Sequence, residues 1–443
     1  MSAGMEQFLS GDRTRWSYLY SYPHKTAYRR FDGPISLRDL WADEPKESLY
    51  LYTHIPFCAS KCSFCNLFSL SRPGQDLVDR YLDQLETQAH AVRAAIGPAK
   101  YSGYAIGGGT PSLLEVPRLE RIFSIQSSVF GVDPSHAGSI EASPDTLTMD
   151  QIQYLSSVGL ERLSLGVQTF DPAEARTLGR PRPDHSLDAL LEAVAKADFP
   201  VFNLDLIYGT AGQTPESFRA SLEKAVSFSP EEIFLYPLYV RPLTPLHRRG
   251  GGPDLEGERM DSLLEVGRQF LADQGYQQDS LRLFRRKDLQ RDDAIEYSCQ
   301  EDGMVGLGVG ARSYTRDAHY STEWAVDRTA VEAVLDSYLA RSPESFAQAD
   351  HGIRLSMDDR KRRFVIKSIL KARGLDLARY TQVFGSEARS DYPDLTELER
   401  LGLAEGSDGW LRLTRRGMAL SDGIGAWLIG PEVAARMNEY ELR

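Results

Sequence analysis

The chain has 443 residues, about three times the ~150 residues of an average domain, so we expect one large domain with additions. Apolar residues make up 42% of the chain and charged residues 26%, which excludes disordered and fibrous proteins. The 51 Lys and Arg against 63 Asp and Glu give a net charge of −12, which disfavours nucleic-acid binding. No stretch approaches the ~18 apolar residues of a membrane span, and the start lacks a signal-peptide core, so we expect a cytoplasmic protein without membrane contact.

Residues 1–48 show no regular hydrophobic period. They interleave the tyrosines Tyr18, Tyr20, Tyr22 and Tyr28 with the basic residues Arg13, Arg15, Lys25, Arg29 and Arg30. We interpret this segment as an N-terminal arm that lies over another part of the chain. Its local basic cluster predicts an anion-binding edge that the negative net charge conceals.

From residue 49 the sequence alternates short β-type runs with helical patterns, as expected for βα units around a parallel sheet. The β-type runs predict strands at 49–55, 101–106, 139–141, 162–168, 201–207 and 232–239. Six units predict an α/β fold, namely a partial (β/α)6 TIM-like barrel over residues 49–320.

Helices are predicted between these strands, where apolar residues recur at steps of three and four. The clearest helix spans Leu77 to Val92 and is punctuated by Gly97-Pro98, and others cover 215–227 and 260–272. The polar segment 248–256 contains three glycines and predicts a surface loop.

After about residue 320 the β/α alternation stops. A helical pattern covers 359–372, leucines follow at Leu395, Leu401 and Leu403, and two short β-like runs surround Trp410. This order predicts a helical, winged-helix-like domain over residues 321–443. Because the chain is acidic and no helix there is strongly basic, we expect a packing domain without DNA contact.

Three of the four cysteines, Cys58, Cys62 and Cys65, lie within eight residues directly after the first predicted strand. The carboxyl end of a barrel strand is where such folds place their chemistry. Three thiolates at this spacing can hold three corners of a cubane iron–sulfur cluster and leave the fourth iron open to a small molecule. A closed zinc site would need a fourth ligand, and the nearest candidate, His54, lies in the strand with poor geometry. We expect the isolated Cys299 to be a small buried residue.

The Cys58, Cys62 and Cys65 spacing, with the aromatic Phe64 before the last cysteine, resembles the signature of the radical S-adenosylmethionine (SAM) superfamily. The resemblance implies a [4Fe-4S] cluster whose open iron is chelated by SAM. It also implies that an electron from the reduced cluster cleaves SAM to methionine and a 5′-deoxyadenosyl radical. A flavodoxin- or ferredoxin-type electron donor is therefore an expected partner, together with a small-molecule substrate.

Four further motifs narrow the branch: 52–58 (YTHIPFC), 107–112 (GGGTPS), 162–168 (RLSLGVQ) and 203–209 (NLDLIYG). They resemble the oxygen-independent coproporphyrinogen oxidase-like (HemN-like) enzymes from about Leu49 to Tyr314, and more weakly onward. That branch implies two bound SAM molecules. Residues matching contacts of the cluster-bound SAM are Tyr52, Gly108, Glu141 and, more loosely, Arg312. Residues matching contacts of the second SAM are Phe64, Gly109, Thr110, Gln168, Arg180, Asp205 and, by spacing, Tyr239.

The chemistry of these side chains fits such roles, although each also has a plainer interpretation. Glycines at 107–109 let a ligand approach the backbone, or they form a tight turn. Glu141 and Asp205 can accept from ribose hydroxyls or an ammonium group, or they are satisfied buried acids. Arg180 can grip a carboxylate with both nitrogens, or it lies on a solvated loop.

Two departures from the branch shape the functional expectation. Asn66-Leu67-Phe68 stands where the oxidase tends to have another cysteine, and residues 297–302 (YSCQED) replace the histidine- and tryptophan-bearing motif of the haem chaperones. A third subgroup of the branch methylates or cyclopropanates sp² carbons through a SAM-derived methylene radical. We therefore expect transfer of a methyl or methylene unit to a small-molecule acceptor. Oxidative decarboxylation of coproporphyrinogen III and a haem-chaperone function are the alternatives.

Overall fold

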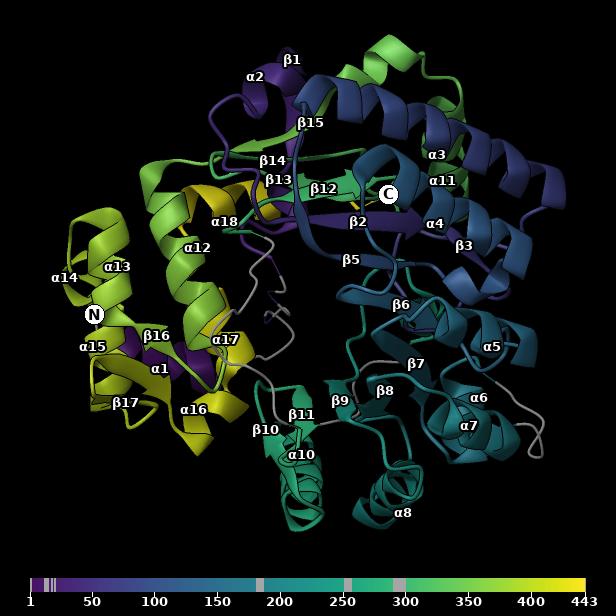
Figure 1. Ribbon diagram of the computed structural model, residues 1–443. Coiled ribbons are helices and arrows are strands. Elements are labelled where there is room, and N and C mark those ends of the chain that lie inside the picture. Colours follow the sequence, from purple (N-terminus) through teal and green to yellow (C-terminus); the bar gives the residue numbers. More distant parts are fainter. Residues whose placement is uncertain are drawn as a thin grey trace.

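The computed structural model of the chain describes residues 2–11, 16, 19, 21–180, 187–250, 257–289 and 300–442 (Figure 1). Several predictions lie outside the described residues. They concern Cys299, the motif residues Tyr297 and Ser298, part of the surface loop at 248–256, and the arm residues Arg13, Arg15, Tyr18 and Tyr20.

The predicted partial barrel is confirmed by a row of parallel strands that follow one another in chain order (Figure 1). The consecutive residues 163–167 of one strand are all buried, as expected for strands covered on both faces. The sheet does not close, because other strands extend both of its edges. The parallel strands are β2 (Leu49–Ile55), β5 (Tyr101–Gly108), β6 (Gly138–Ala142), β7 (Arg162–Gln168), β8 (Val201–Tyr208) and β9 (Glu232–Pro237).

Helices connect these strands where the apolar periodicity predicts them. Helix α3 (Gln75–Ile96) buries Tyr81 and Leu85 and ends at Gly97, whose φ of 76° favours glycine. The remaining connections are α4 (Val116–Phe130), α5 (Met149–Ser157), α6 (Pro172–Thr177), α7 (Leu187–Lys196), α8 (Pro215–Val226), α9 (Pro245–Arg248) and α10 (Gly257–Asp273).

The sheet extends beyond the predicted strands at both edges. One edge adds β12 (Met304–Leu307), which is parallel to β2, and then β13 (Arg312–Tyr314), β14 (Ala318–Ser321), β15 (Gln348–Arg354) and β1 (Arg29–Ser36). The other edge adds β11 (Leu283–Arg286) and β10 (Tyr276–Gln278). Several of these strands have only three or four residues, too few for a period-two pattern. The sheet includes strands on both sides of the predicted domain boundaries at 48/49 and 320/321. These two boundaries remain predictions.

The C-terminal part is helical with a small sheet, as predicted. Its sheet has the strand order β16-β18-β17, and β17 and β18 form the predicted hairpin. The helices are α11 (Arg328–Leu339), α12 (Met357–Ile369), α13 (Leu377–Phe384), α14 (Ala388–Asp391), α15 (Asp394–Arg400), α16 (Arg415–Ala419), α17 (Ser421–Trp427) and α18 (Pro431–Asn438), and the strands are β16 (Leu375–Asp376), β17 (Ala404–Ser407) and β18 (Trp410–Leu413).

The N-terminal arm shares a hydrophobic core with this C-terminal part. Met5 and Leu9, on helix α1 (Ser2–Ser10), are buried in the same cluster as Ile366 and Ile424. In Figure 1 helix α1 lies among the C-terminal helices at the left. The arm is thus folded against the C-terminal helices rather than being a free extension.

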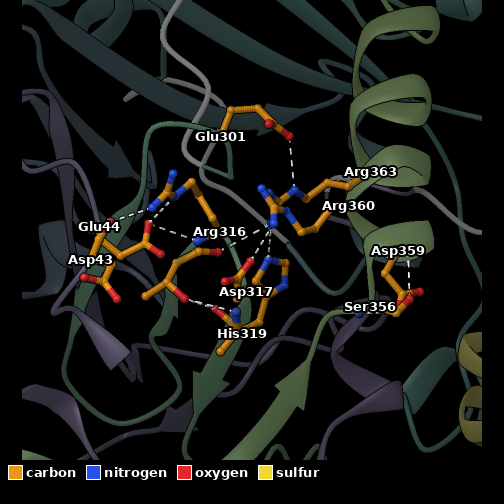
Figure 2. Close-up of polar contacts among 12 residues, drawn as sticks. Asp43, Glu44, Glu301, Arg316, Asp317, His319, Ser356, Asp359, Arg360 and Arg363 are labelled. Atoms are coloured by element: carbon orange, nitrogen blue, oxygen red, sulfur yellow. Dashed lines mark hydrogen bonds and ion pairs between the residues drawn. The ribbon is translucent and has the colours of Figure 1, made fainter. Parts of the chain in front are cut away.

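A polar network joins helix α12 to the outer strands of the sheet (Figure 2). The buried Arg363 donates from Nε to Glu301 Oε1 at 3.1 Å, and its Nη1 lies 3.3 Å from His319 Nε2. Arg360 pairs with Asp317 at 3.0 Å, and Tyr28 of the arm lies 3.3 Å from His319 Nδ1. The arm, strand β14 and helix α12 are therefore held in one arrangement.

Among the described residues, no helix has the length and apolar character needed to cross a membrane.

Candidate active site

The cysteine loop begins where β2 ends. The chain continues through Pro56 into β3 (Phe57–Cys58), which pairs in parallel with β4 (Leu70–Ser71) and thereby closes the loop. Cys58 is buried, while Cys62 and Cys65 are half-buried. The three thiols thus lie at the carboxyl end of the first parallel strand, as predicted.

Ser63 fixes the centre of this loop against two helices. Its backbone N–H donates to Leu178 O at 3.0 Å, and its hydroxyl donates to Thr177 O at 2.8 Å, next to the end of α6. Its carbonyl accepts from the N–H of Leu246 in α9 at 2.7 Å. The loop is therefore held by its backbone before any cofactor binds.

The three thiols affect one another's protonation. Burial raises the pKa of Cys65 to about 12, and the neighbouring Cys62 and Cys58 add to the increase. Burial also raises the pKa of Cys58, which hydrogen bonds with Thr110 and Ser69 oppose. Thiols in this state become thiolates when a cationic metal centre binds them. The donor set therefore fits an iron–sulfur cluster.

A mononuclear zinc site does not fit this loop. Among the described residues, no three His, Cys, Asp or Glu side chains converge closely enough for a single metal ion. Each thiolate of a cubane binds a different iron, which needs a wider arrangement. His54 has both ring nitrogens engaged, since Nδ1 lies 3.2 Å from Tyr52 OH and Nε2 lies 3.0 Å from Phe68 O.

Arg180 lies directly against the cysteine loop. Its Nε donates to Cys62 Sγ at 3.0 Å, and its Nη1 donates to Gly166 O at 2.6 Å and to Ser143 Oγ at 3.3 Å. The sequence predicts this side chain as a contact of the second SAM. In the structure its hydrogen bonds go to a cluster cysteine and to the end of β7.

Tyr52, Gly108 and Glu141 come from the adjacent strands β2, β5 and β6. Gly108 has a φ of 114°, and its N–H donates to Glu141 Oε2 at 3.0 Å. A Cβ at Gly108 would lie 2.5 Å from the His54 ring, so only glycine fits. Desolvation by the surrounding protein raises the pKa of Glu141. The hydrogen bond from the Gly108 N–H lowers this pKa, and the negative charge of Asp205 raises it further. Glu141 nevertheless remains exposed to solvent and can contact a ligand.

Asp205 lies in the middle of β8 rather than at its end. Asn203 Nδ2 donates to Asp205 Oδ1 at 2.8 Å, and Ser164 Oγ lies 3.5 Å from Oδ2. Burial raises the pKa of Asp205, while the nearby Arg162 lowers it. The buried Asn203 Oδ1 has no hydrogen-bond partner within the described part of the chain. An unsatisfied buried acceptor of this kind points to a bound donor.

The other residues predicted to contact the second SAM lie at separate places around the cysteine loop and the ends of the strands. Gln168 ends β7 with a φ of 73°, at a bulge in its pairing with β8, which places backbone strain at the mouth of the barrel. The Gly109 N–H donates to Ile55 O at 2.7 Å, and the Thr110 side chain bonds Cys58. Phe64 packs against an apolar cluster that includes Leu178 and Leu246.

Tyr239 and Arg312 contact parts of the chain distant in sequence. The Tyr239 hydroxyl donates to Asp422 of α17 and accepts from Arg282, and Arg282 and Asp422 form a buried ion pair at 2.7 Å. Arg312 donates from Nη1 to Ser21 Oγ of the arm at 3.4 Å. Both side chains therefore contact the segments that surround the barrel.

Sequence reasoning left two cations near the cysteine loop out of the site. Lys25 Nζ lies 3.7 Å from the centre of the Trp324 ring, and Arg241 lies 4.6 Å over the Tyr239 ring. Burial lowers the pKa of Lys25 well below its ordinary value, with Arg312 and Arg241 adding to the decrease and Cys65 opposing it. Lys25 belongs to the basic arm, but Arg241 follows β9 in a loop with no recognisable pattern.

A cavity of about 50 Å³ lies outside this site. It is bordered by side chains of α3 and of the outer strands, including Gln88, Ser313 and Tyr338. None of the predicted site residues borders it. The cysteine loop, rather than this cavity, is therefore the candidate active site.

Two family descriptions match the chain. The radical SAM superfamily matches residues 52–225, and the HemN C-terminal domain matches residues 355–420. The chain is 28% identical to an oxygen-independent coproporphyrinogen III oxidase of Salmonella typhimurium, with 92% of each chain covered. It is 30% identical to the heme chaperone HemW of Lactococcus lactis, over 61% of this chain and 70% of the relative.

A solved structure of coproporphyrinogen III oxidase (HemN) from Escherichia coli matches with a TM-score of 0.79 and 26% identity, covering 93% of this chain and 97% of that one. This chain belongs to the HemN-like branch of the radical SAM superfamily. A HemN-like radical SAM enzyme uses a [4Fe-4S] cluster and SAM, as the resemblance of the cysteine motif implies. Methyl transfer, expected from the sequence departures, is not supported by these HemN-like relatives, which are named as oxidases and heme chaperones.

Proposed function

We propose that this HemN-like protein oxidises a small molecule bearing carboxylate groups, with oxidative decarboxylation of coproporphyrinogen III as the first reaction to test. The relatives that cover nine-tenths of the chain are oxidases of this kind. The observation that carries the proposal is the group of cations beside the cysteine loop, Lys25, Arg241 and Arg312.

These cations come from three separate segments of the chain. Lys25 belongs to the arm, Arg241 follows β9, and Arg312 begins β13. Each of them lowers the pKa of His24, in addition to the larger effect of burial. Three basic groups in one partly buried place disfavour one another's positive charge, and a bound carboxylate favours it.

The lowered pKa of Lys25 links substrate binding to the protonation of its amino group. Burial and the two arginines disfavour its charged form, whereas a carboxylate bound beside it favours that form. Substrate binding should therefore be coupled to proton uptake by Lys25. A neutral acceptor molecule would bring no such compensation.

The remaining site residues would bind the cluster and SAM. Cys58, Cys62 and Cys65 would bind the cluster, which, when bound, supplies the electron that cleaves SAM. Tyr52, Gly108 and Glu141 would hold the SAM that is cleaved. Arg312, the looser match to a contact of this SAM, is assigned here to the substrate carboxylate together with Lys25 and Arg241. Two bound SAM molecules remain part of the proposal, and the unsatisfied Asn203 Oδ1 next to Asp205 supports a ligand at the second position.

The test is anaerobic incubation of the reconstituted protein with a reductant, SAM and coproporphyrinogen III. We expect carbon dioxide and 5′-deoxyadenosine to form together. Lys25→Met should raise KM for the substrate about tenfold or more, because one charge-assisted contact is lost. Arg400→Met, on the distant helix α15, is the matched control and should leave KM unchanged.

The alternatives predict other products. Methyl-deuterated SAM would pass deuterium to 5′-deoxyadenosine if a methylene radical formed, and a methylated product without carbon dioxide would overturn the proposal. Stoichiometric haem binding with little SAM cleavage would indicate a heme-chaperone function instead.

A further inference from the structure

The cysteine loop reaches the protein surface between two short helices. Ser63, which lies between Cys62 and Cys65, is bonded to Thr177 and Leu178 at the end of α6 and to Leu246 in α9. Ser60, in the same loop, is exposed. The helices α6 and α9 therefore form the outer edge of the cluster-binding loop.

The exposed ionisable side chains on this edge are basic. Arg176 is exposed in the last turn of α6, and His247, Arg248 and Arg249 are exposed at the end of α9. We call these four residues the α6/α9 collar. Arg248 pairs with Asp327 at 2.9 Å and remains 57% exposed. The described residues thus present a local positive surface on a chain whose net charge is −12.

The structure points to the α6/α9 collar as the docking surface for a small acidic electron-carrier protein. We propose this as an extension of the proposed function, because SAM cleavage requires a reduced cluster. One electron leaves the carrier's reduced flavin or iron–sulfur centre, which is oxidised by one electron. The same electron enters the cysteine-bound cluster, which is reduced by one electron, and no other group changes oxidation state.

Position and charge both favour this face. The peptide of Ser63 connects the collar helices directly to the loop between Cys62 and Cys65, so a carrier seated there lies one backbone segment from the cluster ligands. Opposite charges on two proteins accelerate their encounter by 10-fold to ~1,000-fold at low salt.

The experiment reverses two collar charges in the full-length reconstituted protein with Arg176→Glu plus Arg249→Glu. Reduced flavodoxin and, separately, a reduced plant-type ferredoxin serve as electron sources, and 5′-deoxyadenosine is measured at low and high salt. We expect the rate with either carrier to fall about tenfold or more at low salt. Dithionite, a small reductant that needs no docking surface, should support an unchanged rate in the same variant.

The control is Arg400→Glu, whose side chain is 56% exposed. Its helix α15 lies at the left of Figure 1, whereas α6 lies at the right. This control variant should leave carrier-driven rates unchanged. Equal rates for the collar variant and the unmodified protein with both carriers would overturn the inference.

Direct titration of the oxidised carriers separates this inference from the proposed function. If dithionite supports no SAM cleavage in the unmodified protein, the proposed function fails, while carrier binding still tests the collar. Binding that is lost in the collar variant and kept in the Arg400→Glu control supports the collar, and binding equal in both variants contradicts it.

Discussion

Arg180 donates a hydrogen bond from Nε to the sulfur of Cys62 at 3.0 Å, and its Nη1 donates to the carbonyl of Gly166 at 2.6 Å. The guanidinium thus links one of the three cysteines to the end of β7. The Cys62 sulfur accounts for the two largest effects that raise the pKa of Arg180 against the opposing effect of burial. A fixed positive charge at a cluster ligand affects the electron affinity of the cluster.

Arg180→Gln should make the reduction potential of the reconstituted cluster more negative by tens of millivolts. The variant removes a cation and a hydrogen bond that stabilise the additional electron. Redox titration followed by electron paramagnetic resonance measures the potential directly. Arg180→Lys keeps the charge and should give an intermediate value, whereas an unchanged potential in Arg180→Gln would show that the contact has no electronic role.

Cys58→Ala should abolish the iron–sulfur absorbance and SAM cleavage together, because a cubane lacking one corner ligand is labile. The same result is expected for Cys62→Ala and Cys65→Ala. Cys299→Ala provides the matched control and should keep an intact cluster. Retained SAM cleavage in Cys58→Ala would contradict the assignment of the cluster site.

Glu141→Gln should weaken SAM binding and remove its dependence on pH. Desolvation by the surrounding protein raises the pKa of Glu141, so the carboxylate is protonated at a higher pH than that of an ordinary glutamate. As the pH falls through this raised pKa, the acceptor for SAM hydroxyl or ammonium groups is lost, and affinity decreases. Equilibrium binding of SAM between pH 5 and 8 checks this, and a pH profile equal in both proteins would refute it.

Much of the barrel is predictable from its sequence because its strands are buried on both faces. Strands β2 and β7 have the predicted bounds, since their apolar runs end where the chain reaches loops. Strands β12 to β14 were missed, because runs of three or four residues are stabilised by pairing with neighbours rather than by their own pattern.

In the candidate site too, local sequence patterns are predictable, whereas contacts between distant segments are not. The three cysteines are predictable because their spacing is local. The surroundings of Tyr239 are not, because Arg282 and Asp422, its partners, lie far along the chain and meet it only after the C-terminal helices pack. Lys25 was recognised as basic, but only the folded arm places it near Cys65.

Asp391→Asn should destabilise the C-terminal helices by about 1–2 kcal/mol at neutral pH. Burial alone raises the pKa of Asp391, but hydrogen bonds from Lys361, Ser386 and Tyr380 outweigh it and hold the pKa at about 2, below the ordinary 3.8. This stabilisation is complete above the ordinary pKa and is lost as pH falls toward 2. Urea unfolding at pH 7 and pH 3 measures the difference, and an equal loss at both pH values would contradict it.

A decisive experiment incubates the reduced protein under anaerobic conditions with unlabelled SAM and coproporphyrinogen III deuterated on its propionate side chains. We expect deuterium from the substrate to appear in 5′-deoxyadenosine and carbon dioxide to form in proportion. If 5′-deoxyadenosine forms without substrate deuterium and no carbon dioxide is released, the proposed oxidation of a carboxylate-bearing substrate is wrong for this molecule.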